Sequence, residues 1–162
     1  CQQLRRSVLE QVADNRLFQR MMADNALRHR PPVGRFREFV LERKGGDKAT
    51  LDLKIQGLTP FVDGARLLAL ANGVYANNTL ERLRQLITLG VIEPLDGAAY
   101  EEAYHFIQQT RMQQHQLQTR ENRPYSNRVD PDQLNQLDRR ILREALRQAQ
   151  RLQSSLALRY QL

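Results

Sequence analysis

The chain has 162 residues, 41% hydrophobic and 27% charged, which is the composition of a globular domain and excludes an intrinsically disordered one. Its net charge of +7 raises the question of an acidic or nucleic-acid partner, but basic residues are spread along the chain, so nucleic acid is not favoured. The single cysteine, Cys1, excludes an internal disulfide, and no apolar run approaches the roughly 18 residues that cross a membrane. We therefore expect a cytoplasmic protein without a membrane segment.

The N-terminal part predicts two helices followed by a β-hairpin. Apolar side chains at three-and-four spacing favour helices over 3–13 and 15–28, and "RPPVG" at 30–34 ends the second because proline cannot continue a helix. The runs "FREFVLER" and "TLDLKIQG" are rich in branched and aromatic residues, and Gly45-Gly46 between them is typical of a hairpin turn. In the second run, strand alternation would place Leu51, Leu53 and Ile55 on one face and Asp52, Lys54 and Gln56 on the other.

The rest of the chain predicts four more helices. Thr59-Pro60, as N-cap and first-turn proline, opens a helix that ends at Asn72-Gly73. Asn78 with Glu81 resembles a capping box and opens a helix that Gly90 closes. A helix over about 97–119 follows, and Asp130-Pro131 opens a last helix that reaches about residue 160.

The predicted fold class is therefore all-α, a bundle of about six helices with one small β-hairpin insertion near residues 36–56 that packs against them. Because the sequence starts in helical register without an initiator methionine, we interpret residues 1–162 as a single domain excised from a larger protein.

Residues that could carry catalysis are poor candidates. Three histidines and one terminal cysteine cannot form a Cys/His zinc site, and "KGGDK" lacks the length and following helix of a phosphate-binding loop. Asp130 and Asp132 have the spacing of paired metal ligands, but Pro131 between them indicates a helix cap. We expect no catalytic residue, no metal and no cofactor in this chain.

Two charged residues interrupt the otherwise apolar helix that begins at Pro60. At 100° per residue Asp63 and Arg66 fall within one narrow sector, while the remaining circumference is apolar. An unpaired buried charge is too costly to keep, and residues three apart can pair. The pair is therefore either a structural ion pair or, with Lys54 from the preceding strand, the wall of a pocket that receives a ligand.

Further donors stand on two other helices. Arg111 and His115, four residues apart, would present a guanidinium and a titratable ring to one spot, while Thr79 and Arg82 lie near the positive end of another helix. If these side chains converge, they form an anion-binding pocket. The alternative is a solvated polar surface, and the same alternative holds for the basic face of the last helix, Arg139 to Arg151.

Four segments together resemble the putative nucleotidyltransferase substrate-binding domain found in bacterial signalling proteins that also carry CBS and cyclic-nucleotide-binding-like domains. They are "LDLKIQGLTPFVDGARLLAL", "NNTLERLRQL", "AYHFIQQTRMQQHQ" and "NRVDPDQLNQLDRRILREAL", and the order fits across roughly residues 5 to 160. The resemblance implies a helical domain that follows a nucleotidyltransferase domain, which would carry the catalytic signature. The positions expected to bind substrate are Lys54, Asp63, Arg66, Thr79, Arg82, Arg111, His115 and Asn127.

Three functional hypotheses follow. The leading one is a non-catalytic substrate-binding or regulatory module that holds an anionic ligand or a protein substrate in an Arg/Lys-lined pocket. Its partners would be the adjacent nucleotidyltransferase domain of the same polypeptide and a nucleotide or protein substrate, with a homodimer left open. The second is a helical protein- or nucleic-acid-interaction module without a pocket. The third is a standalone nuclease, which "RMQQH" disfavours because its Arg/His spacing is too short.

Overall fold

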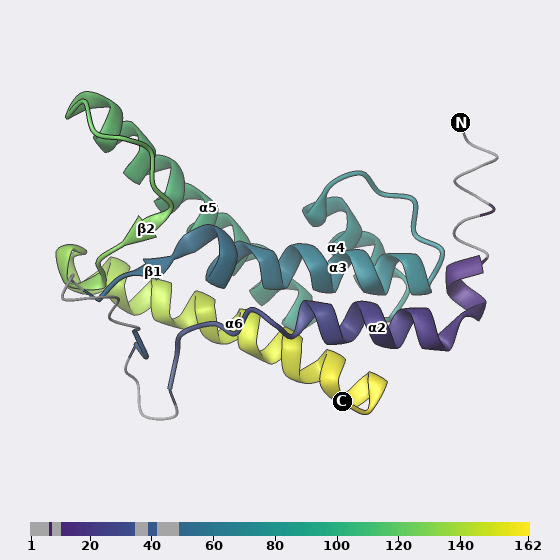
Figure 1. Cartoon of the computed structure of the whole chain (residues 1–162). Coiled ribbons are helices and arrows are strands. Elements are labelled where there is room, and N and C mark those ends of the chain that lie inside the picture. The colour runs from purple at the N-terminus through teal and green to yellow at the C-terminus, as the bar shows by residue number, and fades with distance from the viewer. Residues whose placement is uncertain (1–6, 8–10, 35–38, 42–48) are drawn as a thin grey trace.

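The structure, a computed structural model, describes residues 7, 11–34, 39–41 and 49–162 (Figure 1). Its elements are, in order, α2 (Arg16–Ala26), β1 (Leu51–Asp52), a π-helical segment (Leu53–Leu58), α3 (Thr59–Ala71), α4 (Thr79–Thr88), α5 (Pro94–Arg120), β2 (Arg128–Val129), a 3-10 turn (Pro131–Gln133) and α6 (Gln136–Tyr160). The predicted all-α bundle with a small antiparallel sheet is confirmed. The predicted first helix, 3–13, lies mostly outside the described residues, although 11–14 are helical.

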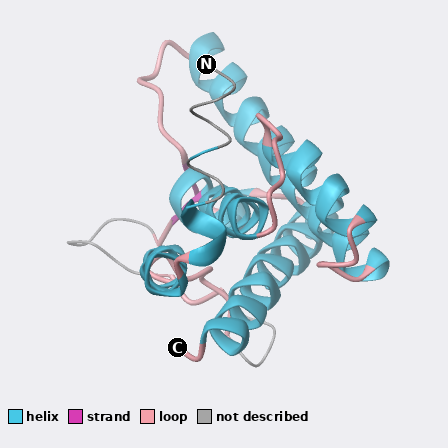
Figure 2. Cartoon of the chain, turned by 90° about the vertical axis from the view of Figure 1, so that its right-hand side faces the viewer, coloured by secondary structure: helices cyan, strands magenta, loops and turns pink. Residues whose placement is uncertain are grey.

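Helix α3 forms the centre of the bundle and packs against α2, α4 and α6. Its side chains Phe61 and Leu67 are completely buried, as are Leu142 and Leu146 on α6. Each such side chain stabilises the fold by about 1.5–3 kcal/mol relative to leaving it exposed. Figure 2 shows how completely helices dominate the described chain. None of these described helices is both long and apolar enough to span a membrane.

Close packing of α3 on α6 depends on Gly64. A Cβ atom at this position would lie 2.9 Å from Cδ2 and 3.2 Å from Cγ of Leu152, closer than normal van der Waals contact. On another side of α3, the ring centroid of Phe61 lies 6.2 Å from those of both Tyr100 and Tyr104 on α5. The lack of a side chain at Gly64 therefore lets the two helices approach.

The small sheet joins different segments from those that the sequence predicted. β1 pairs antiparallel with β2, so that Leu51 faces Val129 and Asp52 faces Arg128. Most of the run predicted as the first strand, and the Gly45-Gly46 turn, lie outside the described residues, and Val33 forms an isolated bridge with Phe39.

The predicted strand over "TLDLKIQG" is wrong beyond Asp52. The Oδ1 atom of Asp52 accepts the backbone N–H groups of Lys54 and Ile55 and so begins the π-helical segment. Strand alternation is lost there, and Ile55, predicted to point inward with Leu53, is 43% exposed.

Several helix ends agree with the predicted signals. The Oδ1 atom of Asn78 accepts the N–H of Glu81 at 2.8 Å, and the two glycines at helix ends, Gly73 and Gly90, have φ of 68° and 69°. Thr59, expected as an N-cap, instead lies within continuous helix and donates its hydroxyl to the carbonyl of Lys54.

The last helix begins later than predicted. Asp130 caps only the 3-10 turn, accepting from the N–H of Asp132, whereas Asn135 caps α6 by accepting from the N–H of Asp138 at 2.8 Å. Helix α5 continues to Arg120, and Figure 1 shows its C-terminal end extending beyond the bundle before the chain returns to β2.

Candidate functional site

The predicted charged pair on α3 is present. The Nη1 atom of Arg66 lies 3.2 Å from Oδ1 of Asp63, and the two side chains are 47% and 19% exposed. The pair therefore lies at the surface edge of α3 and not in the core. Sequence reasoning found the pairing because residues three apart on a helix share a face.

Arg82 on α4 lies close to this pair. Its Nε atom donates to the carbonyl of Ala76 at 3.1 Å, and its pKa is lowered from the usual value by partial burial and by repulsion from Arg66, with Glu81 opposing. Thr79, the first residue of α4, is buried. Arg82 and the Asp63–Arg66 pair form one group at the α3–α4 surface, and the buried Thr79 lies one helical turn from Arg82.

A second group connects α5 to the segment before β2. The Nε atom of Arg111 donates to Oδ1 of Asn127 at 2.6 Å, and the carbonyl of Asn127 accepts from the N–H of Leu53 at 2.9 Å. The ring of His115 lies 5.5 Å from that of Tyr125, and its Nε2 atom is buried without a hydrogen-bond partner among the described residues. This group fixes the returning chain against α5.

The eight predicted residues thus form two groups and not one cluster. Lys54, exposed in the π-helical segment, neighbours the second group through Leu53, whereas Arg66 belongs to the first. Lys54 and Arg66 are twelve positions apart in continuous helix, roughly 15–18 Å along the axis. Which of the eight bind substrate stays a prediction.

The buried face of α5 carries both apolar and polar side chains. Tyr100 and Ile107 are buried and lie at helical spacing on the same face as Arg111 and His115, whereas Leu117 is 43% exposed. The face of α5 that packs in the core therefore continues into Arg111 and His115, which are half-buried.

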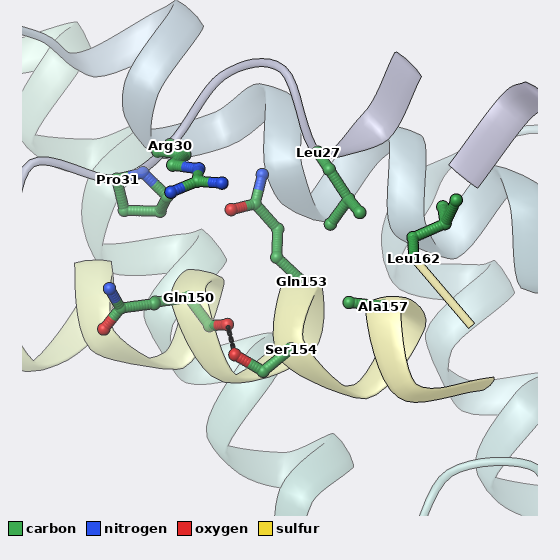
Figure 3. A pocket seen from close by; sticks show the side chains of 8 residues that line it. All are labelled: Leu27, Arg30, Pro31, Gln150, Gln153, Ser154, Ala157 and Leu162. Atoms are coloured by element: carbon green, nitrogen blue, oxygen red, sulfur yellow. Dashed lines mark hydrogen bonds between the residues drawn. The ribbon is translucent and has the colours of Figure 1, made fainter. Parts of the chain in front are cut away.

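Three cavities lie elsewhere among the described residues. One of about 250 Å³, between the end of α2 and α6 (Figure 3), is lined by Leu27, Arg30, Pro31, Gln150, Gln153, Ser154, Ala157 and Leu162. A second of about 400 Å³ lies along one face of α5, from His105 to Gln116. None of the eight predicted residues lines either of these or the third.

The third cavity, which we call the arginine cavity, has a volume of about 460 Å³. Three separate segments form it, the turn after α2, the chain from Thr50 into the π-helical segment, and β2. Its described lining residues are Arg28, His29, Arg30, Thr50, Asp52, Ile55, Gln56 and Arg128.

The turn that carries Arg28 and Arg30 is held in place by α6. Pro31 and Pro32 are buried and end the helical path, while the buried side-chain amide of Gln153 donates to the carbonyls of Ala26 and His29, each at 2.8 Å. The backbone around His29 is therefore fixed, and the two arginines on either side of it line the cavity. In Figure 3 the side chain of Arg30 lies beside that of Gln153.

The opposite side of the cavity is also built by hydrogen bonds. Arg128 donates from Nε to Oγ1 of Thr50 at 2.8 Å. The Oδ1 atom of Asp52, the cross-strand neighbour of Arg128, accepts hydrogen bonds from the N–H groups of Lys54 and Ile55. The N–H of Asp52 donates to Oε1 of Gln56 at 2.8 Å. These bonds orient the polar atoms before any ligand binds.

The lining chemistry favours an anion. Three arginines and one aspartate are among its described lining residues, so positive charge is in excess there. Within the described residues neither Arg28 nor Arg30 has an ion-pair or hydrogen-bond partner for its side chain. Guanidinium groups bind phosphate and carboxylate through paired, charge-assisted hydrogen bonds. The described residues contain no group of three or more His, Cys, Asp or Glu side chains placed to hold a metal ion.

Sequence reasoning missed this cavity. "RPPVG" at 30–34 indicates only a helix stop, and no local pattern singles out Arg128. The one local signal was the dense basic run at a helix end, but nothing local indicated that β2 would be placed beside it.

Comparison with known proteins gives one match. A family model described as "putative nucleotidyltransferase substrate binding domain" matches residues 16–160. Neither the curated proteins nor the solved structures give a match.

Proposed function

The chain belongs to the putative nucleotidyltransferase substrate binding domain family, and we propose that it is a non-catalytic module that holds an anionic ligand for an adjacent nucleotidyltransferase domain of the same polypeptide. The ligand binds in the arginine cavity. The observation that carries this proposal is the meeting of Arg28, Arg30 and Arg128, from two distant segments, around one volume of about 460 Å³.

Electrostatics supports an anionic ligand there. Like charges that share a partly enclosed space repel one another, and Asp52 balances only part of the charge of the three arginines. An anion would offset the remaining repulsion and receive donors whose backbone is already fixed. The cavity volume falls within the range of about 300–1,000 Å³ that is usual for small-molecule sites.

A second anionic contact is proposed at the α3–α4 group. Arg66 and Arg82 lie close enough for the first to lower the pKa of the second, and Asp63 orients Arg66. This is the function predicted for these residues from the sequence, and it would add to the arginine cavity and not replace it.

Calorimetric titration of the chain with tripolyphosphate tests the arginine cavity. The double variant Arg28→Ala/Arg30→Ala is compared with Arg16→Ala/Arg140→Ala, which removes the same charge from exposed positions outside the cavity. We expect the first variant to weaken binding at least about tenfold and the second by less than about twofold. Equal weakening in both would show that only the net charge matters, and the cavity would not be the site.

A further inference from the structure

We infer that the ligand of the arginine cavity is a nucleoside di- or triphosphate, in which Asp52 accepts from the ribose hydroxyls while the arginines hold the phosphates. This inference rests on the proposed function and specifies its ligand. It is carried by the lining residues that are not cations, namely Asp52, Ile55 and Gln56.

The free oxygen of Asp52 is the first argument. Its Oδ1 atom accepts both N–H groups of the π-helical segment, whereas no hydrogen bond among the described residues involves Oδ2. An ionised carboxylate only accepts hydrogen bonds and repels phosphate oxygens. A ligand that suits the whole cavity must therefore offer both anionic groups and hydroxyl donors.

A phosphorylated sugar meets both requirements. Ribose hydroxyls donate to an acidic side chain in dinucleotide sites for the same reason. Inorganic phosphate or a simple polyphosphate would satisfy the arginines but would leave Asp52 facing negative charge. The carboxylate thus selects against the simplest anions.

Ile55 and Gln56 extend the argument to a base. Oε1 of Gln56 is fixed by the N–H of Asp52, which leaves the two donors of its Nε2 atom without a partner in the described part of the chain. Ile55 presents an apolar side chain that is 43% exposed beside it. An apolar surface next to an oriented amide suits a planar heterocycle with acceptor atoms, and mostly apolar linings with a few placed polar groups are usual for small-molecule sites.

The test compares each ribonucleoside triphosphate, its 2′-deoxy form and tripolyphosphate on the chain and on Asp52→Asn. Asparagine keeps the oxygen that accepts the backbone N–H groups but replaces the free acceptor by a donor. The matched control is Asp24→Asn, an exposed residue of α2 that carries the same charge change outside the cavity.

We expect at least one ribonucleoside triphosphate to bind about tenfold or more tightly than tripolyphosphate. Asp52→Asn should remove most of that difference, because it should weaken binding of the nucleotide and leave binding of tripolyphosphate equal or tighter. Asp24→Asn should change neither affinity. If tripolyphosphate binds as tightly as every nucleotide, the nucleotide inference fails and the anion-binding function stands. If neither binds to the unmodified chain, the proposed function fails as well.

Discussion

Gln153 and His29 lie 124 positions apart, yet the side-chain amide of Gln153 donates to the carbonyl of His29 at 2.8 Å. The same nitrogen donates to the carbonyl of Ala26, which ends α2. One buried amide on α6 therefore holds the last residue of α2 and the turn between the two cavity arginines in place.

Replacing Gln153 with alanine should destabilise the fold and disturb the cavity. Two carbonyl groups would lose a donor, which costs about 1–3 kcal/mol for each group left buried and unsatisfied. Urea denaturation measures the stability and titration with tripolyphosphate measures the binding. Gln150→Ala, one turn earlier on the exposed side of α6, is the control and should leave both unchanged. If Gln153→Ala changed neither the stability nor the binding, the turn would not depend on these hydrogen bonds.

The two predicted polar groups should differ in what they contribute to stability. Arg111→Ala removes a charge-assisted hydrogen bond to Asn127 at 2.6 Å in a half-buried position, and we expect a loss of about 1.5–3 kcal/mol. Arg66→Ala removes a surface ion pair with Asp63, which is typically worth about 0–1 kcal/mol. Thermal denaturation measures the loss of stability in each variant. A larger loss for Arg66→Ala than for Arg111→Ala would contradict the interpretation of Asp63–Arg66 as a surface ion pair.

Gly64→Ala tests the packing of α3 on α6. Alanine favours helix by about 1 kcal/mol over glycine, but its Cβ would lie 2.9 Å from Leu152, and overpacking costs about 1–3 kcal/mol. We expect net destabilisation, seen as a lower urea midpoint. Gly73→Ala is a useful comparison because space is open there and its cost comes from the φ of +68° alone. A stabilised Gly64→Ala would show that Leu152 moves aside freely.

Stability should fall at alkaline pH through Tyr100. Burial, and then the charge of Asp96, raise its pKa above the usual value of 10.0, while Arg151 opposes them. The folded chain therefore retains this proton when the unfolded chain loses it. The contribution of Tyr100 to the free energy of unfolding is fully present below about pH 10 and is lost as pH rises through the folded-state pKa.

Tyr100→Phe should reduce that alkaline loss when urea midpoints are compared between pH 9 and pH 11. It should not abolish the loss, because burial also raises the pKa of Tyr160. The same substitution at exposed Tyr75 serves as the control. An unchanged pH profile in Tyr100→Phe would exclude this tyrosine as a source.

Local signals in the sequence predicted the features that depend on a few neighbouring residues. The cap at Asn78 and the turns at Gly73 and Gly90 are where they were expected, because each requires only its own backbone geometry and residues within one turn. The Asp63–Arg66 pair was predictable for the same reason. The late start of α6 was not, because both Asp130 and Asn135 are good caps and their sequence does not decide which one opens the helix.

The sequence by itself determined the helical class of this protein and the family to which it belongs, because apolar periodicity, capping residues and local motifs are properties of short segments. Only the tertiary structure decided that Asp52 ends a strand and pairs opposite Arg128, and that both lie beside Arg28 and Arg30. These placements depend on long-range bonds such as Gln153 to His29, whose donor and acceptor meet only after α6 has packed against the end of α2.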